Sequence, residues 1–450
     1  MSNTEHLATM GLFDAKVPRY TSYPTAPQFT GNVNGGTHCD WIKAIPEGAE
    51  ISLYVHIPFC RRLCWFCACR TQGTQTDAPV IAYLEVLKAE LAHLAEILPA
   101  GVRLSRLHWG GGTPTLLSPV MIRDLARSIF AVAPLAGYGE FSVEIDPNEI
   151  DGFRIAALMA AGMTRASVGV QDFDPTIQAA IGRSQSYEVT RDAITLLRTA
   201  GVASLNADIL YGLPHQTRAR MTESVQRLLS LGPDRVALYG YAHVPWMAKR
   251  QQLIPTSALP TPEERLNLFE TARRLFLWDG YAEIGIDHFA MKGDGLEIAQ
   301  RTGRLRRNFQ GYTDDAAEHL IGVGASAISR FPQGYTQNAA ATAAHMAAIR
   351  EGRFSTSRGH ALSREDRLRA AMIEAVMCDF RIDMEKMKAL GADPAWLRAE
   401  FKSVASRFPG VTLARDEGFE ILPEGRPLTR MIAHGFDAYE LARAGHSSAV

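Results

Sequence analysis

Hydrophobic and polar positions alternate along the first two thirds of the chain in a repeated order of short and long segments. Short runs rich in β-branched and aromatic residues predict strands, and longer segments with apolar residues at helical spacing predict amphipathic helices. The predicted strands cover residues 51–57, 105–109, 140–145, 165–170, 204–210 and 235–241, with a weaker seventh at 281–286. The predicted helices cover about 78–98, 118–133, 151–161, 186–200, 217–231 and 261–279, with Asp77 and Ser118 as N-caps of the first two.

This alternation predicts right-handed βαβ units and a parallel sheet. Six or seven such units favour an α/β fold with a partial (β/α)6 barrel, similar to a TIM barrel, over a flat sheet. The predicted strands end in polar or Gly-rich turns such as HIPFC, WGGGTP and GVQDF. Because the C-terminal strand ends build the active site in parallel α/β folds, we expect one shared site there.

The pattern changes after about residue 290, where residues 293–315 predict an extended loop. From about residue 362, helical segments and a hairpin around Asp416–Gly418 predict a mostly helical, winged-helix-like domain. The last residues, AGHSSAV, predict a disordered tail. We therefore expect four parts, which are an N-terminal segment that covers the active site (1–48), the barrel (49–290), an extension that completes the site (291–360) and the C-terminal domain (361–450).

Composition and charge describe an ordinary globular protein of 450 residues, with 46% hydrophobic and 21% charged residues. The net charge of -1 gives no overall electrostatic reason to bind nucleic acid or an acidic membrane. The N-terminus lacks the basic and apolar regions of a signal peptide, and no run approaches the roughly 18 apolar residues of a membrane span. We therefore expect a cytoplasmic protein.

Four of the six cysteines lie together in the segment HIPFCRRLCWFCACRT. Cys60, Cys64 and Cys67 have the spacing C-x3-C-x2-C, and Cys69 follows. Three thiolates on one loop predict a [4Fe–4S] cluster that leaves one iron open to a small molecule. The alternatives are a structural zinc site that uses all four cysteines and an electron-transfer cluster. Zinc sites usually need two separated ligand pairs, and a ferredoxin cluster needs a more distant fourth ligand.

The cysteine spacing after a first strand resembles the signature of radical S-adenosylmethionine enzymes. Further matching segments follow in order, namely PRYTSYPTA (18–26), YVHIPFC (54–60), HWGGGTPT (108–115), VEIDP (143–147), GVQDF (169–173), DILYGLP (208–214), NFQGYT (308–313), GASAIS (324–329) and CDFRID (378–383). Over most of its length the chain resembles the oxygen-independent coproporphyrinogen III oxidases, which belong to haem biosynthesis.

This resemblance implies an oxidoreductase in which a 5′-deoxyadenosyl radical removes a hydrogen from the β-carbon of a propionate. Loss of CO2 and one electron then leaves a vinyl group. Two rounds convert coproporphyrinogen III to protoporphyrinogen IX without O2. The resemblance also implies a reducing electron donor such as flavodoxin or ferredoxin. We expect no nucleic-acid partner and a monomer.

The resemblance assigns cofactor-binding roles to particular positions. It places Gly111 and Glu144 on the first S-adenosylmethionine, with Tyr54 and Ile328 nearby. It also implies a second S-adenosylmethionine, at Phe66, Gly112, Thr113, Gln171, Arg183, Asp208 and Ala242. Each of these positions also has a structural interpretation. The glycines are typical of an ordinary strand–helix turn. Glu144 is alternatively a solvated acid at a strand end, and Arg183 a surface cation at a helix end.

Cys69 and Tyr20 are the candidate catalytic residues. Cys69 is interpreted as a thiol that the reaction needs but that does not bind the cluster; the alternative is a small buried loop residue. Tyr20, with Arg19 and Tyr23, lies in a segment that we expect to cover the substrate pocket, where four propionates require cations and aromatic surface. The alternative is a segment packed on the barrel for stability. Arg306 and Arg307 suit either propionate binding or a solvated basic loop.

Two other functions remain open. One is a haem-binding chaperone related to this family, which is disfavoured because PRYTSYP and Cys69 are both present. The other is a different radical enzyme with two S-adenosylmethionine molecules, such as a methylating or haem-opening relative. Such enzymes are not expected to keep PRYTSYP, NFQGYT and CDFRID together.

Overall fold

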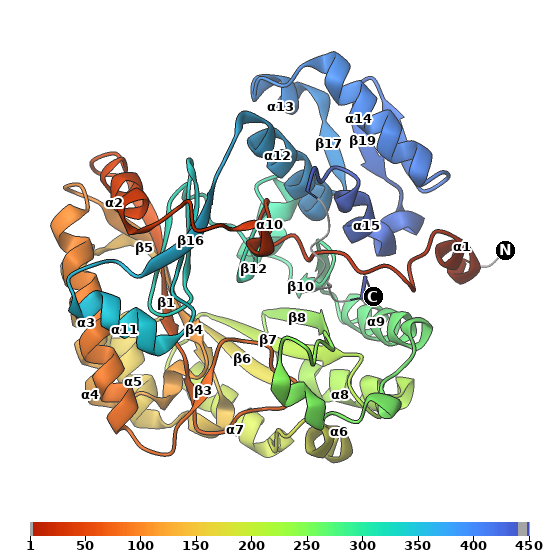
Figure 1. The fold of residues 1–450 in the computed structure, drawn as a ribbon. Coiled ribbons are helices and arrows are strands. Elements are labelled where there is room, and N and C mark those ends of the chain that lie inside the picture. The colour runs from red at the N-terminus through yellow and green to blue at the C-terminus, as the bar shows by residue number, and fades with distance from the viewer. Residues whose placement is uncertain (1–2, 440–447, 450) are drawn as a thin grey trace.

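The computed structural model describes residues 3–439 and 448–449, and its central feature is a 12-stranded sheet (Figure 1). In spatial order its strands are β16 (Thr356–Ala361), β15 (Gly334–Asn338), β14 (Ile328–Phe331), β13 (Leu320–Val323), β1 (Glu50–Ile57), β4 (Arg103–Gly111), β5 (Leu135–Ile145), β6 (Arg165–Gln171), β7 (Ser204–Tyr211), β8 (Arg235–Gly240), β10 (His288–Ala290) and β9 (Ala282–Ile284). The run from β13 through β8 is parallel, and the strands at both edges are antiparallel. The prediction of an α/β fold with a mostly parallel sheet is confirmed.

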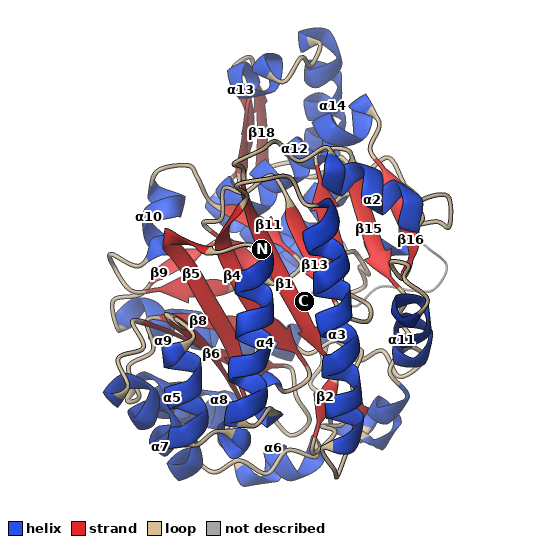
Figure 2. Ribbon diagram, turned by 90° about the vertical axis from the view of Figure 1, so that its left-hand side faces the viewer, coloured by secondary structure: helices blue, strands red, loops and turns tan. Residues whose placement is uncertain are grey.

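A helix follows each of six parallel strands, and these helices cover one face of the sheet, as Figure 2 shows for the first three of them. They are α3 (Ala78–Ile97), α4 (Pro119–Val132), α5 (Gly152–Ala160), α7 (Tyr187–Thr199), α8 (Arg218–Leu229) and α9 (Pro262–Trp278). Six strand–helix units therefore follow one another as the periodicity predicts. Ser118 caps α4 by accepting a hydrogen bond from Met121 N–H. Asp77 makes no side-chain cap, because its carboxylate pairs with Arg61 instead.

The seventh predicted strand is present, but it does not continue the parallel sheet as a further βαβ unit would. Residues 281–286 include β9, which forms an antiparallel hairpin with β10, and β10 then pairs antiparallel with β8. The chain reverses at Gly285, whose φ of 55° lies in the left-handed region, and an added Cβ there would overlap the ring of Tyr312. The local apolar pattern indicates a strand, but this turn decides its direction.

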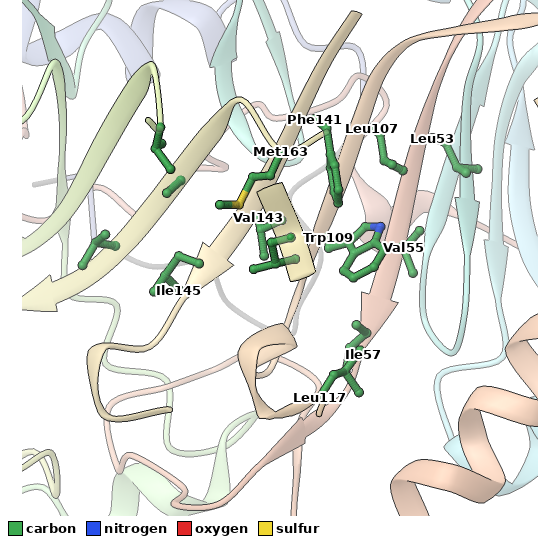
Figure 3. Packing of buried hydrophobic residues seen from close by; sticks show 14 of the residues in the cluster. Leu53, Val55, Ile57, Leu107, Trp109, Leu117, Phe141, Val143, Ile145 and Met163 are labelled. Atoms are coloured by element: carbon green, nitrogen blue, oxygen red, sulfur yellow. The ribbon is translucent and has the colours of Figure 1, made fainter. Parts of the chain in front are cut away.

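The two faces of the sheet differ in polarity because side chains alternate along each strand. Figure 3 shows the apolar face, where Leu53 and Val55 of β1 lie near Trp109 of β4 and Phe141 of β5. All four are fully or almost fully buried beneath the helices. The opposite face carries polar residues at the intervening positions, including Tyr54, His56, His108, Ser142, Glu144, Ser167, Asn206 and Asp208. The strands thereby separate a packed core from a polar interior.

Residues 291–360 contain more regular structure than the sequence predicts. The expected extended loop holds α10 (Gly295–Arg301) and a hairpin of β11 (Arg306–Asn308) and β12 (Gly311–Thr313). Asp294 caps α10 and also pairs with Arg235 of β8, with side chains only 7% and 4% exposed. This distant ion pair holds the segment in place, which local patterns do not reveal. The helix α11 (Thr342–Arg350) lies between β15 and β16.

The C-terminal unit packs around a second hydrophobic core, which it shares with the N-terminal segment. It comprises α12 (Arg364–Asp379), β17 (Arg381–Asp383), α13 (Met384–Ala389), α14 (Pro394–Arg407), β18 (Thr412–Arg415), β19 (Gly418–Ile421) and α15 (Thr429–His434). The predicted hairpin is present as β18 and β19, and β17 adds a third strand to it.

The N-terminal segment, with α1 (Asn3–Thr9) and α2 (Gly35–Lys43), contributes Leu7, Leu12 and Tyr20 to the core of the C-terminal unit. In Figure 1 this red segment runs from α1 past α15 and α12 to α2. The predicted disordered tail is described only at residues 448–449. These two residues pack against the N-terminal segment, where Ala449 N–H donates to Ala15 O, and the other tail residues lie outside the described part.

Among the described residues, no helix has the length and apolar content of a bilayer-spanning segment.

Candidate active site

The four clustered cysteines lie on a closed loop at the C-terminal end of β1. Two short parallel strands, β2 (Phe59–Cys60) and β3 (Gln72–Gly73), form the base of this loop. Gln72 N–H donates to Pro58 O at 2.7 Å, and Thr74 N–H donates to Cys60 O at 3.0 Å. The loop thus presents the predicted ligands Cys60, Cys64 and Cys67 beside the ends of the parallel strands.

The thiols are close enough to influence one another. Burial raises the pKa of Cys60 to about 11, although a hydrogen bond from Thr113 opposes this, and the neighbouring cysteines raise it further. Cys60, Cys64 and Cys67 are half-buried, whereas Cys69 is exposed and shares a hydrogen bond with Cys67. Within residues 3–439 and 448–449, no three potential ligands converge on the position of a single ion. A cubane cluster does not need such convergence, because each thiolate binds a different iron. The donor set fits a [4Fe–4S] cluster.

Arg183 lies directly against the cysteine loop. One of its amino groups donates to Cys64 Sγ at 3.5 Å, and the other donates to Gly169 O at 2.9 Å and lies 3.5 Å from an Asp146 carboxylate oxygen. Its side chain is only 12% exposed. The interpretation of Arg183 as a surface cation is therefore wrong. A cation in this place favours the thiolate forms that metal binding requires.

The Gly-rich loop after β4 is bound to the cysteine loop through main-chain contacts. Gly112 N–H donates to Ile57 O, and Thr113 N–H donates to Phe59 O, each at 2.8 Å. A Cβ at Gly112 would lie 2.5 Å from Phe59 O, so no larger residue fits without moving the backbone. The residue type at this position is therefore set by a close approach between two loops and not by an ordinary turn.

Glu144, at the end of β5, is held by two donors on the polar face. Gly111 N–H donates to Oε2 at 3.0 Å, and His108 Nε2 lies 3.3 Å from Oε1. Burial raises the pKa of Glu144, but the hydrogen bonds and charge of His108 and the Gly111 N–H outweigh it, so the pKa is lowered. The side chain still has 40% of its surface open. It is therefore an oriented, ionised carboxylate with room for a cationic or hydroxyl-bearing ligand.

Tyr54 lies on β1 and Ile328 on β14, and β13 separates these two strands in the sheet. Tyr54 stacks on His108 with ring centroids 5.8 Å apart, and its hydroxyl is 3.0 Å from His56 Nδ1. In the sheet Tyr54 pairs with Gly322, where an added Cβ would lie 2.6 Å from Ile328 O. The structure thus places Tyr54 and Ile328, which are 274 positions apart, on either side of the same strand β13.

Gln171 is the last residue of β6, whereas Asp208 lies within β7, three residues before its last residue, Tyr211. A register shift between Gly169 and Gln171 accompanies a φ of 69° at Gln171, so the strand ends in an unusual conformation. Asp208 accepts hydrogen bonds from Asn206 at 2.8 Å and Ser167 at 3.3 Å. Burial, and then the charge of Glu144, raises the pKa of Asp208 to about 6. The two carboxylates therefore share one polar interior.

Phe66 and Ala242 are joined through a residue that sequence reasoning missed. Gln251 Nε2 donates to Phe66 O at 2.7 Å and to Ala242 O at 3.0 Å. Gln251 is fully buried in a short 3-10 helix, Lys249–Leu253. No motif marks this glutamine, and only the tertiary structure shows that it links the cysteine loop to the end of β8.

His56 and His108 were also missed, although a signal for them exists. Both lie within matching segments, YVHIPFC and HWGGGTPT, and both stand two residues from another polar-face position on their strands. His108 Nδ1 is 2.6 Å from Ser142 Oγ, and His56 Nε2 is 3.2 Å from Arg70 O. Alternation along β1 and β4 would have indicated them.

Tyr20 lies in the core of the C-terminal unit. Its hydroxyl donates to Asp437 Oδ2 at 2.8 Å and is 3.0 Å from His434 Nδ1. These contacts support the alternative of a packed N-terminal segment, and the catalytic role of Tyr20 stays a prediction. Arg306 is 53% exposed and pairs with Glu374, whereas Arg307 is buried beside Asp287. The two arginines, which the sequence treats alike, thus differ in environment.

Comparison with known proteins agrees with this site. Residues 54–228 match the Radical SAM superfamily. A Paracoccus denitrificans relative, "Oxygen-independent coproporphyrinogen III oxidase", is 64% identical over 451 residues and covers 100% of both chains. The chain belongs to the oxygen-independent coproporphyrinogen III oxidases.

More distant members of this family also match the chain over nearly its whole length, at lower identity. The Escherichia coli relative of the same name is 36% identical and covers 96% of this chain and 95% of its own. The solved structure of the coproporphyrinogen III oxidase from Escherichia coli, described as a radical SAM enzyme, has a TM-score of 0.90 at 35% identity and covers 95% of this chain and 100% of its own. This coproporphyrinogen III oxidase family member is a radical SAM oxidoreductase. Membership of the superfamily implies a [4Fe–4S] cluster and S-adenosylmethionine.

Proposed function

We propose that this enzyme converts coproporphyrinogen III to protoporphyrinogen IX by oxidative decarboxylation of two propionates, without O2. The 64% identity over the full length of a coproporphyrinogen III oxidase carries this proposal. The arrangement of thiols, glycines and carboxylates at one end of the parallel strands supports it. The products would be two vinyl groups and two molecules of CO2. The haem-binding chaperone and the other radical enzymes remain the alternatives for the test below.

We propose that Cys60, Cys64 and Cys67 hold the cluster. When bound, the cluster and S-adenosylmethionine supply a 5′-deoxyadenosyl radical. Gly111 and Glu144 would bind the cofactor's amino-acid or ribose groups, since a glycine backbone and an oriented carboxylate suit both. Tyr54 and Ile328 would form the wall around them, and Cys69 would act near the cluster without binding it.

A second S-adenosylmethionine is proposed beside the first. Its candidate residues are Phe66, Gly112, Thr113, Gln171, Arg183, Asp208 and Ala242. Asp208 can accept hydrogen bonds from ribose hydroxyls, and Arg183 can bind a carboxylate. Support comes from the contacts that connect these positions, above all the link from Phe66 to Ala242 through Gln251 and the contact between Arg183 and the cysteine loop.

The division of the chain is also a proposal. Residues 49–290 would be a partial (β/α)6 barrel, residues 291–360 its extension, and residues 361–450 a winged-helix-like domain. Residues 1–48 would cover the active site, and exclusion of water by this cover would protect a radical. We further propose a monomer that receives its electron from a donor such as flavodoxin or ferredoxin. The reducing cytoplasm suits its free thiols.

The function is tested with the protein purified and reduced without oxygen. Coproporphyrinogen III and S-adenosylmethionine are supplied, and CO2, 5′-deoxyadenosine and protoporphyrinogen are measured together. We expect all three from the native chain, none from Cys64→Ala, and native amounts from Cys39→Ala, because Cys39 lies outside the loop in α2. Formation of 5′-deoxyadenosine without a vinyl product would contradict the proposal that coproporphyrinogen III is the substrate. Stoichiometric haem binding without turnover would support a chaperone, and a zinc-containing protein without iron would contradict both.

A further inference from the structure

A cavity of about 380 Å³ lies beside the C-terminal ends of β7 and β8. Its walls come from these strand ends, from α9, from the turn between β9 and β10, from the C-terminal unit and from the N-terminal segment. The cavity is therefore bounded by parts of the chain that are far apart in sequence. The proposed reaction does not yet assign a role to it.

Arginines dominate the charged lining of this cavity. Six of them line it, namely Arg19, Arg265, Arg273, Arg307, Arg426 and Arg430, together with the acids Glu270, Glu283, Asp287 and Glu424. Most of the acids are already engaged with cations. Glu283 pairs with Arg273 at 2.9 Å and with Arg426 at 3.5 Å, and Glu270 pairs with Arg273 at 3.5 Å. Asp287 lies 3.4 Å from Arg307. The described lining thus holds six arginines against four carboxylates, an excess of positive charge.

Arg307 has unused donors in this cavity. Its side chain is 4% exposed, and one amino group donates to Asp287 Oδ2 at 3.4 Å. Its Nε and Nη1 atoms are buried and have no hydrogen-bond partner among the described residues. The guanidinium stacks on the ring of Tyr312, with Cζ 4.4 Å from the ring centroid, which fixes its plane. A buried donor pair without a partner is costly, so this geometry calls for an acceptor from outside the chain.

Arg19 reaches the same cavity from the N-terminal segment. Its Nη2 donates to Gly240 O at 2.6 Å, and within residues 3–439 and 448–449 no carboxylate lies at ion-pair distance from it. The segment around it is fixed on both sides. Arg430 Nε donates to Pro18 O at 3.1 Å, and the Tyr20 hydroxyl donates to Asp437. Arg19 is thus a positioned cation and not part of a loose tail.

The cavity adjoins the proposed cofactor site through β8. Tyr239 precedes the cavity residue Gly240, and its hydroxyl lies 3.4 Å from His288 Nε2. The ring of His288 packs edge-on against Tyr312, the residue on which Arg307 stacks. On the other side, Tyr239 pairs in the sheet with Leu210, two positions beyond Asp208. A ligand in the cavity would therefore lie beside the strand ends where we propose the chemistry.

We propose that this cavity binds propionate carboxylates of the tetrapyrrole, with Arg19 and Arg307 as direct ligands. This inference rests on the proposed function and adds the residues that recognise the substrate. A guanidinium binds a carboxylate through charge-assisted hydrogen bonds, and Nε and Nη1 of Arg307 are donors that have no partner among the described residues. The volume is at the lower end of the roughly 300–1,000 Å³ of ligand pockets, so the cavity would hold a propionate-bearing edge of the macrocycle.

The test measures KM and kcat for coproporphyrinogen III in Arg19→Gln, Arg19→Lys and Arg307→Lys, all loaded with cluster. Arg274→Gln is the matched control, because Arg274 lies on the exposed side of α9 and does not line the cavity. We expect Arg19→Gln to raise KM about 10- to 100-fold, as for the loss of a hydrogen bond to a charged group. The lysine variants should give smaller increases, because Lys keeps the charge but lacks the paired donors.

The affinity for S-adenosylmethionine serves as the second measurement and should stay within about 2-fold of native in every variant. An unchanged KM in folded, iron-loaded Arg19→Gln would overturn the inference. So would an increase that Arg274→Gln shares. If Arg307→Lys does not fold, Arg19→Gln still decides. Absence of vinyl product from the native enzyme would instead contradict the proposed function, which separates the two failures.

Discussion

Glu144 and Asp208, two carboxylates on the polar face of the sheet, have pKa values shifted in opposite directions. Glu144 receives hydrogen bonds from Gly111 and His108, so its pKa is lowered despite burial. Burial raises the pKa of Asp208 to about 6, and the charge of Glu144 adds to this rise, while the neutral donors Asn206 and Ser167 oppose it only in part. Such divergent pairs are typical of functional sites, because each environment favours a different protonation state.

Glu144→Gln tests the carboxylate role. The amide keeps the size but loses the charge, so we expect the affinity for S-adenosylmethionine to fall about 10- to 100-fold while iron content stays native. Equilibrium binding on the cluster-loaded protein measures this. Glu47→Gln, at an exposed position before β1, is the control and should bind natively. Native affinity in Glu144→Gln would contradict the role.

Asp208→Asn tests the raised pKa through stability. The folded protein holds this proton more tightly than the unfolded chain, so the stabilising contribution is complete below the ordinary pKa of 3.8 and is lost as pH rises through about 6. Asn does not ionise. The free energy of unfolding of the variant, relative to that of the native protein, should therefore rise by roughly 1–3 kcal/mol between pH 4 and 6 and then level off. Urea unfolding from pH 4 to 8 measures this difference. Asp192→Asn, in a surface pair with Arg191, should show little change, and a flat difference for Asp208→Asn would refute the argument.

At the scale of elements, the site depends on the contact between the Gly-rich loop and the base of the cysteine loop. The main-chain bonds of Gly112 and Thr113 to β1 and β2 leave no space for a side chain at Gly112. The strand ends therefore hold the proposed cluster ligands through backbone contacts, and the close approach of Phe59 leaves room only for glycine at position 112.

Gly112→Ala should disturb that contact. The new Cβ would lie 2.5 Å from Phe59 O and 2.9 Å from Phe59 N, and backbone cannot move aside as a flexible side chain does. We expect a loss of about 1–3 kcal/mol in stability and a lower iron content after reconstitution. Thermal unfolding and iron analysis measure both. Gly137→Ala in β5 is the matched control, because nothing lies within 4 Å of its added Cβ.

At the scale of the whole molecule, the N-terminal segment and the C-terminal unit form one hydrophobic core. Tyr20 and Tyr23 are buried in it, Tyr23 accepts a hydrogen bond from Ala438 N–H, and Arg430 donates to the carbonyls of Val17 and Pro18. The C-terminal unit thereby fixes the segment that carries Arg19. Substrate recognition in the proposed cavity would depend on this docking.

Tyr20→Phe tests the docking. It removes the hydrogen bond to Asp437 and leaves a buried carboxylate oxygen without that donor, so we expect a loss of about 1–3 kcal/mol. Residues 1–30 should also become more accessible to protease, and KM for the substrate should rise more than kcat falls. Tyr187→Phe, whose hydroxyl is exposed beside Ser230, is the control. A large drop in kcat with native stability would favour the catalytic interpretation of Tyr20 instead.

The amino-acid sequence by itself determined the six strand–helix units, the cysteine spacing and the Gly-rich loop. Periodicity and covalent spacing act over a few residues, so such features can be predicted without a structure. The family resemblance adds Glu144 and Asp208, and alternation along β1 and β4 would have added His56 and His108.

Only the tertiary structure decided which of these side chains meet. Arg183 contacts Cys64 across 119 positions, Gln251 contacts Phe66 across 185, and Tyr20 contacts Asp437 across 417. No local pattern records such pairings, because they depend on how complete elements pack. For the same reason Arg306 and Arg307, neighbours in sequence, face solvent and cavity respectively.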